Sequence, residues 1–84
     1  MEKDYLTLKW GTLKDWYFTR EKGKKLLQEY FDIGASMSAM AQKDTPRQKK
    51  IICELIEECN GEIWNDWDGK KMTKKQAKDY VMNY

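Results

Sequence analysis

The segment DTPRQKKIICELIEECNG, residues 44–61, contains the clearest helix signal in the chain. Thr45 can cap a helix, and Pro46 is favoured at the first helical position, where its missing N–H has no partner to lose. We therefore predict a helix that begins at Pro46 and ends at Asn60-Gly61, where glycine can take the left-handed conformation of a helix C-terminus. One face of this helix is buried, because apolar side chains recur at helical spacing at Ile51, Ile52, Leu55, Ile56 and Cys59.

The chain before this helix predicts at least one strand and one further helix. Tyr5 to Trp10 alternates apolar and polar side chains, which is the period of a half-buried strand. Leu13 to Phe18 is rich in aromatic residues but lacks clean alternation, so we expect a second strand or an irregular extended segment. Thr19 can cap a helix whose first turn includes Glu21 and whose apolar stripe consists of Leu26, Leu27, Tyr30, Phe31 and Ile33.

A stretch of small residues and methionines, Gly34 to Ala41, follows this stripe. Small side chains let another backbone or a ligand approach closely, so Ser36 and Ser38 are candidate ligand-binding residues. Close packing of two helices is the alternative explanation for the same composition.

The last third of the chain predicts a β-hairpin and a final helix. Glu62 to Trp67 and Lys70 to Met72 form the two strands, and Asp68-Gly69 supplies the positive φ angles of a two-residue turn. The two tryptophans of the hairpin fall on opposite faces, so one should be less buried than the other. Thr73 to Gln76 matches a capping box, and the helix that it starts has an apolar stripe of Ala77, Tyr80, Val81 and Tyr84.

These elements predict an α+β fold in one small domain over residues 1–84, with one or two N-terminal strands, two central helices, a β-hairpin and a C-terminal helix. A chain of 84 residues buries roughly 60–65% of its unfolded surface, so its single core is thin. Mostly basic segments at 43–50 and 70–78 flank an acidic one at 54–68, and such blocks could dock one subunit on another. We expect a homo-oligomer, with solvated charged faces as the alternative.

The composition argues against catalysis and against a metal site. The chain has no histidine, which is the commonest general base and a frequent zinc ligand. Cys53 and Cys59 on one helix point about 120° apart and cannot pair. Asp66 and Asp68 flank Trp67 near a turn, and we interpret them as turn formers and not as an acid–base pair. We expect no enzyme activity, no metal and no cofactor.

The chain shows no predicted export or membrane segment. Its start, Met1-Glu2-Lys3-Asp4, is charged and leads directly into the first strand, unlike a secretory signal. No apolar run reaches the roughly 20 residues that cross a bilayer. With two cysteines expected to be reduced, these observations predict a cytoplasmic protein that does not bind membranes.

The predicted start of the Pro46 helix is the best anion-binding candidate in the sequence. A helix N-terminus offers free backbone N–H groups and the positive end of the helix dipole. Thr45 adds a hydroxyl group, and Arg47 and Lys50 add positive charge. An ordinary capped helix with a solvated basic first turn explains the same residues, so both interpretations stay open.

Aromatic residues give a second ligand hypothesis. Four tryptophans and five tyrosines exceed the needs of so thin a core, and nucleobases stack on aromatic rings. Trp10, Trp16 or Trp64, together with Arg47 or a nearby lysine, could hold a nucleotide. Burial of these rings in the core is the alternative.

Three segments resemble short uncharacterised proteins of bacteriophages and prophages: LKWGTLKDW (8–16), MSAMAQKDTPRQKKIICELIE (37–57) and DWDGKKMTKKQAKDYVMNY (66–84). The resemblance covers most of the chain but includes no motif of known chemistry, so it identifies no functional residue. It implies a binding protein that antagonises bacterial defence in the cytoplasm of the host cell. The partner would be a nucleotide-type small molecule that acts as an immune signal, or a host defence protein that is inhibited as anti-CRISPR proteins inhibit their targets.

A small nucleic-acid-binding or regulatory protein is the alternative function. The last predicted helix and the residues before it carry Lys71, Lys74, Lys75 and Lys78, and phosphate contacts dominate the affinity of proteins for nucleic acid. Duplex binding that weakens steeply with salt would favour this alternative. A thermal shift with one specific nucleotide would favour sequestration, because a ligand that binds only the folded state stabilises it.

Overall fold

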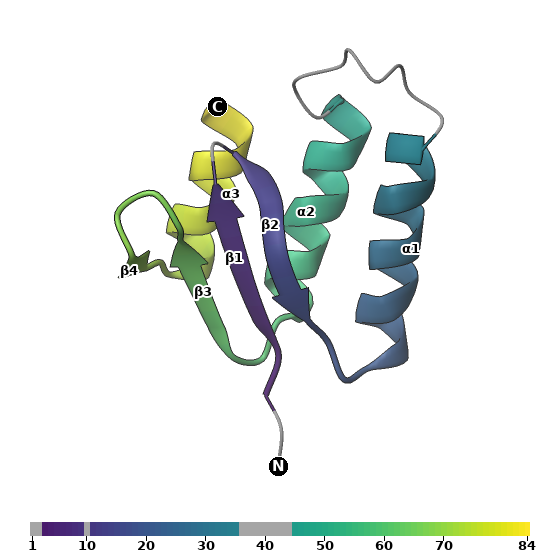
Figure 1. The fold of residues 1–84 in the computed structure, drawn as a ribbon, viewed down its shortest axis with the longest axis horizontal. Coiled ribbons are helices and arrows are strands. Elements are labelled where there is room, and N and C mark those ends of the chain that lie inside the picture. Colours follow the sequence, from purple (N-terminus) through teal and green to yellow (C-terminus); the bar gives the residue numbers. More distant parts are fainter. Residues whose placement is uncertain (1–2, 10, 36–44) are drawn as a thin grey trace.

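The computed structural model of the protein describes residues 3–9, 11–35 and 45–84. In chain order they form β1 (Tyr5–Lys9), β2 (Thr12–Tyr17), α1 (Glu21–Ala35), α2 (Pro46–Glu58), β3 (Glu62–Asn65), β4 (Lys70–Lys71) and α3 (Lys74–Asn83). This order confirms the predicted α+β fold, and the segment before α1 forms two strands (Figure 1). Within these ranges, no helix has the combination of length and apolarity that a membrane span requires.

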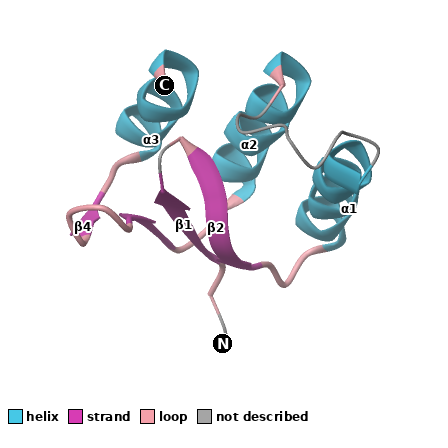
Figure 2. Cartoon of the chain, turned by 45° about the horizontal axis from the view of Figure 1, so that its top comes forward, coloured by secondary structure: helices cyan, strands magenta, loops and turns pink. Residues whose placement is uncertain are grey.

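The strands form one sheet in the order β2-β1-β3-β4, with β1 and β3 at its centre. β1 pairs antiparallel with β2 and parallel with β3, and β3 pairs antiparallel with β4. Parallel neighbours need a crossover connection, which here runs through β2, α1 and α2. The three helices lie on one side of the sheet, with α2 between α1 and α3 (Figure 1 and Figure 2).

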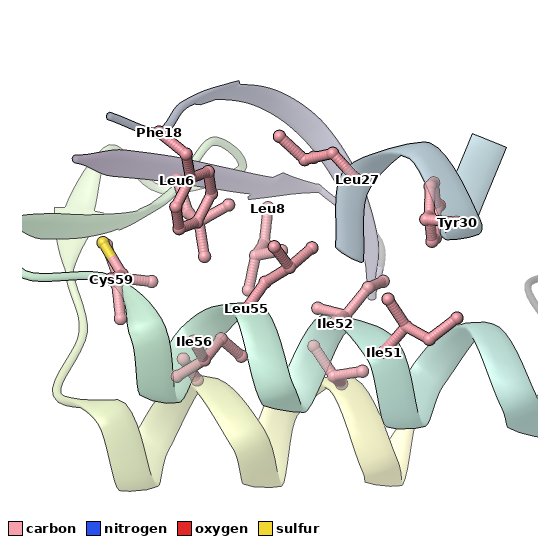
Figure 3. Packing of buried hydrophobic residues seen from close by; sticks show 13 residues of the cluster. Leu6, Leu8, Phe18, Leu27, Tyr30, Ile51, Ile52, Leu55, Ile56 and Cys59 are labelled. Atoms are coloured by element: carbon pink, nitrogen blue, oxygen red, sulfur yellow. The ribbon is translucent and has the colours of Figure 1, made fainter. Parts of the chain in front are cut away.

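The core lies between the sheet and α2 (Figure 3). Leu6 and Leu8 of β1 are fully buried, as the alternation of that strand predicts. Burying a side chain of this size stabilises the fold by about 1.5–3 kcal/mol. The predicted apolar stripe of α2 is buried in full, and the other helices contribute Leu27, Tyr30, Ala77 and Val81.

Two helices begin with the caps that the sequence predicts. The Thr45 hydroxyl oxygen accepts a hydrogen bond from the backbone N–H of Gln48 at 3.1 Å, and the Gln48 side chain accepts from the N–H of Thr45 at 3.0 Å. Thr73 and Gln76 form the same reciprocal pair at the start of α3. Each pair satisfies backbone N–H groups that have no partner within the helix, so both helix starts are fixed by local sequence.

Two other predicted helix boundaries are wrong. α2 ends at Glu58, and Gly61 does not have the positive φ that a left-handed C-terminus requires. α1 begins at Glu21, so Thr19 does not take the cap position before it, and the Thr19 hydroxyl donates instead to Asp4. Both errors arise because these residues form a long-range contact, described below, that local sequence does not reveal.

The turn between β3 and β4 is longer than predicted. Asn65 pairs with Lys70, so four residues, Asp66 to Gly69, connect the strands in place of the predicted two. Gly69 has the predicted positive φ, 68°, and its N–H donates to the backbone oxygen of Asn65 at 2.8 Å. Trp67 therefore lies in the turn, where its side chain is 70% exposed. The prediction that one tryptophan of the hairpin is less buried is confirmed.

A buried carboxylate, that of Asp4, joins three segments that are far apart in sequence. Its Oδ1 accepts from the backbone N–H and the hydroxyl of Thr19, at 2.9 and 3.1 Å, and its Oδ2 accepts from the N–H of Asn60 at 3.3 Å. The N–H of Asp4 donates to the Asn60 side chain at 3.0 Å, and Arg20 lies 3.9 Å from the carboxylate. A Cβ on Gly61 would lie 1.8 Å from the backbone oxygen of Asp4, so only glycine permits this approach.

We predict that Asp4→Asn lowers the free energy of unfolding by about 1–3 kcal/mol, because an amide offers one acceptor oxygen and turns its NH2 group toward a donor. Urea unfolding followed by circular dichroism measures the change. Asp79→Asn makes the same chemical change on the exposed surface of α3 and should stay within about 0.5 kcal/mol of the wild type. Equal stabilities of the two variants would contradict the role given to Asp4.

Candidate ligand-binding surface on the open face of the sheet

One face of the sheet carries no helix among the described residues (Figure 2). Because Leu6 and Leu8 point toward the helices, alternation turns their neighbours Tyr5 and Thr7 toward the other face. In the strand register, Tyr5 lies between Tyr17 and Glu62, and the next row aligns Asp15, Thr7, Trp64 and Lys71. We call this surface the open face and define it by Tyr5, Thr7, Asp15, Tyr17, Glu62, Trp64 and Lys71.

Two tyrosines stack on the open face. The ring centroids of Tyr5 and Tyr17 are 6.1 Å apart, with 20° between the ring planes. The two side chains are 37% and 38% exposed, so each keeps a large part of its ring surface in contact with solvent. The Tyr5 hydroxyl donates to Asp15 at 3.5 Å. The pair therefore forms a small aromatic platform that spans β2 and β1.

Trp64 lies in the neighbouring row and is fixed by two charged side chains. Its indole N–H donates to Glu62 Oε2 at 2.9 Å, and Lys71 Nζ lies 5.5 Å from the ring centroid. Lys71 also pairs with Glu62 Oε1 at 3.1 Å. Hydrogen bonds from Lys71 and then from Trp64 hold the pKa of the Glu62 carboxyl below its usual range. Glu62 is therefore ionised at neutral pH, and it orients both the indole and the ammonium group.

Charges at the rim of the open face are largely paired. Lys9 and Lys14 lie 3.9 and 3.6 Å from Asp66, which follows β3. The surface thus combines exposed aromatic rings with ammonium groups that exposed carboxylates neutralise. Exposed ion pairs of this kind contribute little to stability, about 0–1 kcal/mol each, so an anionic ligand can replace a carboxylate at small cost.

The structure separates the sequence-predicted aromatic candidates. Trp64 lies on the open face, whereas Trp16 pairs with Leu6 and points to the helix side of the sheet. The Trp16 ring packs at 4.8 Å from the ring of Phe31 in α1. Trp10, Ser36 and Ser38 lie outside the described residues.

The predicted anion-binding residues lie at α2, on the opposite side of the sheet from Trp64. The Thr45 side chain is occupied in the capping box, and Arg47 pairs with Glu29 of α1 at 2.7 Å. Lys50 lines two surface hollows that also contain Glu54. Trp64 and Arg47 therefore do not share a site, and acidic neighbours compete with an anion at the start of α2.

Two aromatic residues of the open face, Tyr5 and Tyr17, were not predicted from the sequence, whereas Lys71 was predicted as a nucleic-acid contact. Alternation places Tyr5 opposite the buried leucines of its strand, which was the only local signal for it. β1 pairs with β2 on one side and with β3 on the other, which places Tyr17 and Trp64 on either side of β1. The pairing with β3 joins segments far apart in the sequence, so no local pattern predicts it. The register of β1 against β2 shifts between Thr7 and Leu8, which marks a β-bulge. The bulge changes which β2 side chains share a face, so the sequence of β2 shows no regular alternation.

The described residues offer stacking and hydrogen bonding and little reactive chemistry. Burial raises the pKa of the Cys53 and Cys59 thiols, so both are protonated and poor nucleophiles at neutral pH. No group of three or more potential metal ligands gathers in these parts of the chain. No protein-family model, curated protein or solved structure matches the chain, so these comparisons assign no function to it.

We predict that Lys71→Gln raises the pKa of Glu62 toward its ordinary value, because it removes the largest cause of the depression. A depressed pKa contributes stability above the unfolded-state pKa, and this contribution is lost as the pH falls through the folded-state pKa. The stability difference between wild type and variant should therefore disappear in acid. Carboxyl NMR titration measures the pKa, and Lys70→Gln, the same change one residue earlier, should leave it unchanged.

Proposed function

We propose that this protein is a non-catalytic binding protein that holds the base of a nucleotide-type ligand on the open face. The observation that carries the proposal is the placement of Tyr5, Tyr17 and Trp64, from three adjacent strands, on the one sheet face without helices. Each of these rings lies at a position that a solvated sheet usually gives to a polar side chain. Stacking of a base on an aromatic side chain contributes about 1–3 kcal/mol.

The polar groups around the rings also suit such a ligand. Lys71 lies against Trp64, so a phosphate attached to a base stacked there would be within reach of an ammonium group. Asp15 and Thr7 lie in the same row as Trp64, next to the row of the tyrosine pair, and offer acceptor and donor groups for the edge of a base. A phosphate would compete with Glu62 for Lys71, which predicts that binding weakens as the salt concentration rises.

The biological setting that we propose is antagonism of a bacterial defence system by a phage-type protein. Sequestration of a nucleotide-derived immune signal on the open face would antagonise the defence system without any catalytic step. Inhibition of a defence effector protein through the same surface would have the same effect. This setting is supported by the resemblance of the sequence to phage and prophage proteins, and the chemistry of the open face supports the nucleotide ligand in particular.

Single-stranded nucleic acid is a second candidate ligand, favoured by the two rows of the open face. The tyrosine pair and Trp64 provide two stacking positions on neighbouring strands, and only a ligand with at least two bases occupies both. The lysines of α3 favour this ligand less than the sequence suggested. Lys74 donates to the backbone oxygen of Glu57 at 2.8 Å, and Lys78 pairs with the Glu57 carboxylate.

We predict that the protein binds a nucleotide or a short oligonucleotide in calorimetric titrations, and that Trp64→Ala and Tyr17→Ala each weaken binding about 5- to 150-fold. The panel contains nucleoside monophosphates, cyclic mono- and dinucleotides, and single-stranded oligomers of two to eight nucleotides. Trp67→Ala, which removes an exposed tryptophan outside the open face, is the matched control and should leave affinity unchanged.

The same titrations separate the two ligand classes. Affinity that rises with oligomer length and falls steeply with salt indicates single-stranded nucleic acid. Saturable binding of one cyclic nucleotide, with no gain from a longer strand, indicates a sequestered signal. The proposal fails if no member of the panel binds, or if Trp67→Ala weakens binding as much as Trp64→Ala.

A further inference from the structure

A second aromatic site lies at the opposite side of the β3–β4 turn from the open face. A pocket of about 270 Å³ is lined by Asn65 at the end of β3, Trp67 in the turn, and Tyr80 and Tyr84 at the end of the chain. Sites for drug-sized ligands measure roughly 300–1,000 Å³, so this pocket is suited to a single small group. Three of the four described residues that line it are aromatic.

The rings that line the pocket are held by neighbouring structure. Tyr80 and Tyr84 are one helical turn apart, and their centroids lie 5.8 Å from each other with 69° between the planes. A Cβ on Gly11 would lie 2.5 Å from Cβ of Tyr84, so the glycine lets its backbone lie close against this tyrosine. On the other side, the N–H of Trp67 donates to the Asn65 side chain at 2.9 Å, which fixes the turn that carries the indole.

The ring geometry favours a compact ligand over a planar one. A nucleobase stacks best on ring faces that are nearly parallel to it, such as those of the Tyr5–Tyr17 platform. The two tyrosines of the pocket meet closer to edge-to-face, with 69° between their planes, so they offer a planar group no pair of parallel faces, whereas a rounded group can contact both rings. Trp67 adds a third aromatic surface to the same pocket.

The charge around the pocket favours a cation. Aromatic faces carry the negative part of the ring quadrupole, and a cation near several of them is stabilised. The described residues that line this pocket include no lysine or arginine, whereas Lys22, Arg47 and Lys3 each line another hollow of the surface. Trp67 itself stands between two carboxylates in sequence, Asp66 and Asp68, of which Asp66 also pairs with Lys9 and Lys14.

From the three aromatic rings and the lack of a lysine or arginine among the described lining residues, we infer that the pocket of Asn65, Trp67, Tyr80 and Tyr84 binds a quaternary or methylated ammonium group. The contact is a cation–π interaction with three rings, and methyl groups on the nitrogen suit it because they weaken hydration of the charge. This inference does not depend on the proposed function, since it concerns other residues and a ligand of opposite charge. It adds a site for an organic cation to a protein whose open face suits an anion.

Choline and its uncharged isostere 3,3-dimethylbutan-1-ol test the inference, because they share a shape and differ in charge. Titrations of each followed by 1H–15N NMR should shift the indole N–H of Trp67, with the uncharged compound binding roughly 5- to 30-fold more weakly. Trp67→Leu and Tyr84→Leu keep apolar side chains and remove π faces, so each should weaken choline binding. Trp64→Leu, which alters the open face, is the control and should leave choline binding unchanged.

Three results would overturn the inference. One is equal affinity for choline and 3,3-dimethylbutan-1-ol, which would make the pocket merely apolar. Another is the absence of any choline-dependent shift at Trp67. The third is tighter binding of adenosine than of choline at Trp67, which would make the pocket a base-binding site. Trp67 is 70% exposed and Tyr84 48% exposed, so both leucine variants should keep the fold, which their NMR spectra would establish directly.

Discussion

The carboxylate of Asp4 is the contact on which the arrangement of the sheet depends. It lies just before β1, and it is bonded to the segment that leaves β2 and to the segment that enters β3. These two connections set the strands on either side of β1, one antiparallel and one parallel. Gly61 completes the junction because it allows the chain to pass against the Asp4 backbone. The rows of the open face follow from this alignment.

One-sided layering explains why aromatic residues remain exposed. The helices all pack on the same side of the sheet, where the leucines of β1 and the stripe of α2 form the core. Among residues 3–9, 11–35 and 45–84, no helix covers the second side. No helix of the described residues packs on Tyr5, Tyr17 and Trp64, so contact with another molecule would bury these rings further.

Much of the fold was predictable because its signals are local. The caps of α2 and α3, the stripe of α2 and the alternation of β1 each involve residues within a few positions of one another. The candidate site was less predictable, because it depends on which strands pair. Trp16 and Trp64 are both half-buried strand tryptophans, yet the bulge in β2 turns the first toward α1, while the register of β3 turns the second to the open face.

The parallel pairing of β1 with β3 has a consequence for the order of folding. The hairpin of β1 and β2 joins neighbours in sequence and can form as soon as both strands exist. The centre of the sheet must wait, because β3 begins 57 residues after the start of β1, at Glu62. During synthesis, Leu6 and Leu8 therefore lack their partners in β3 until Ile63 and Asn65 have left the ribosome, so β1 is enclosed long after it is made.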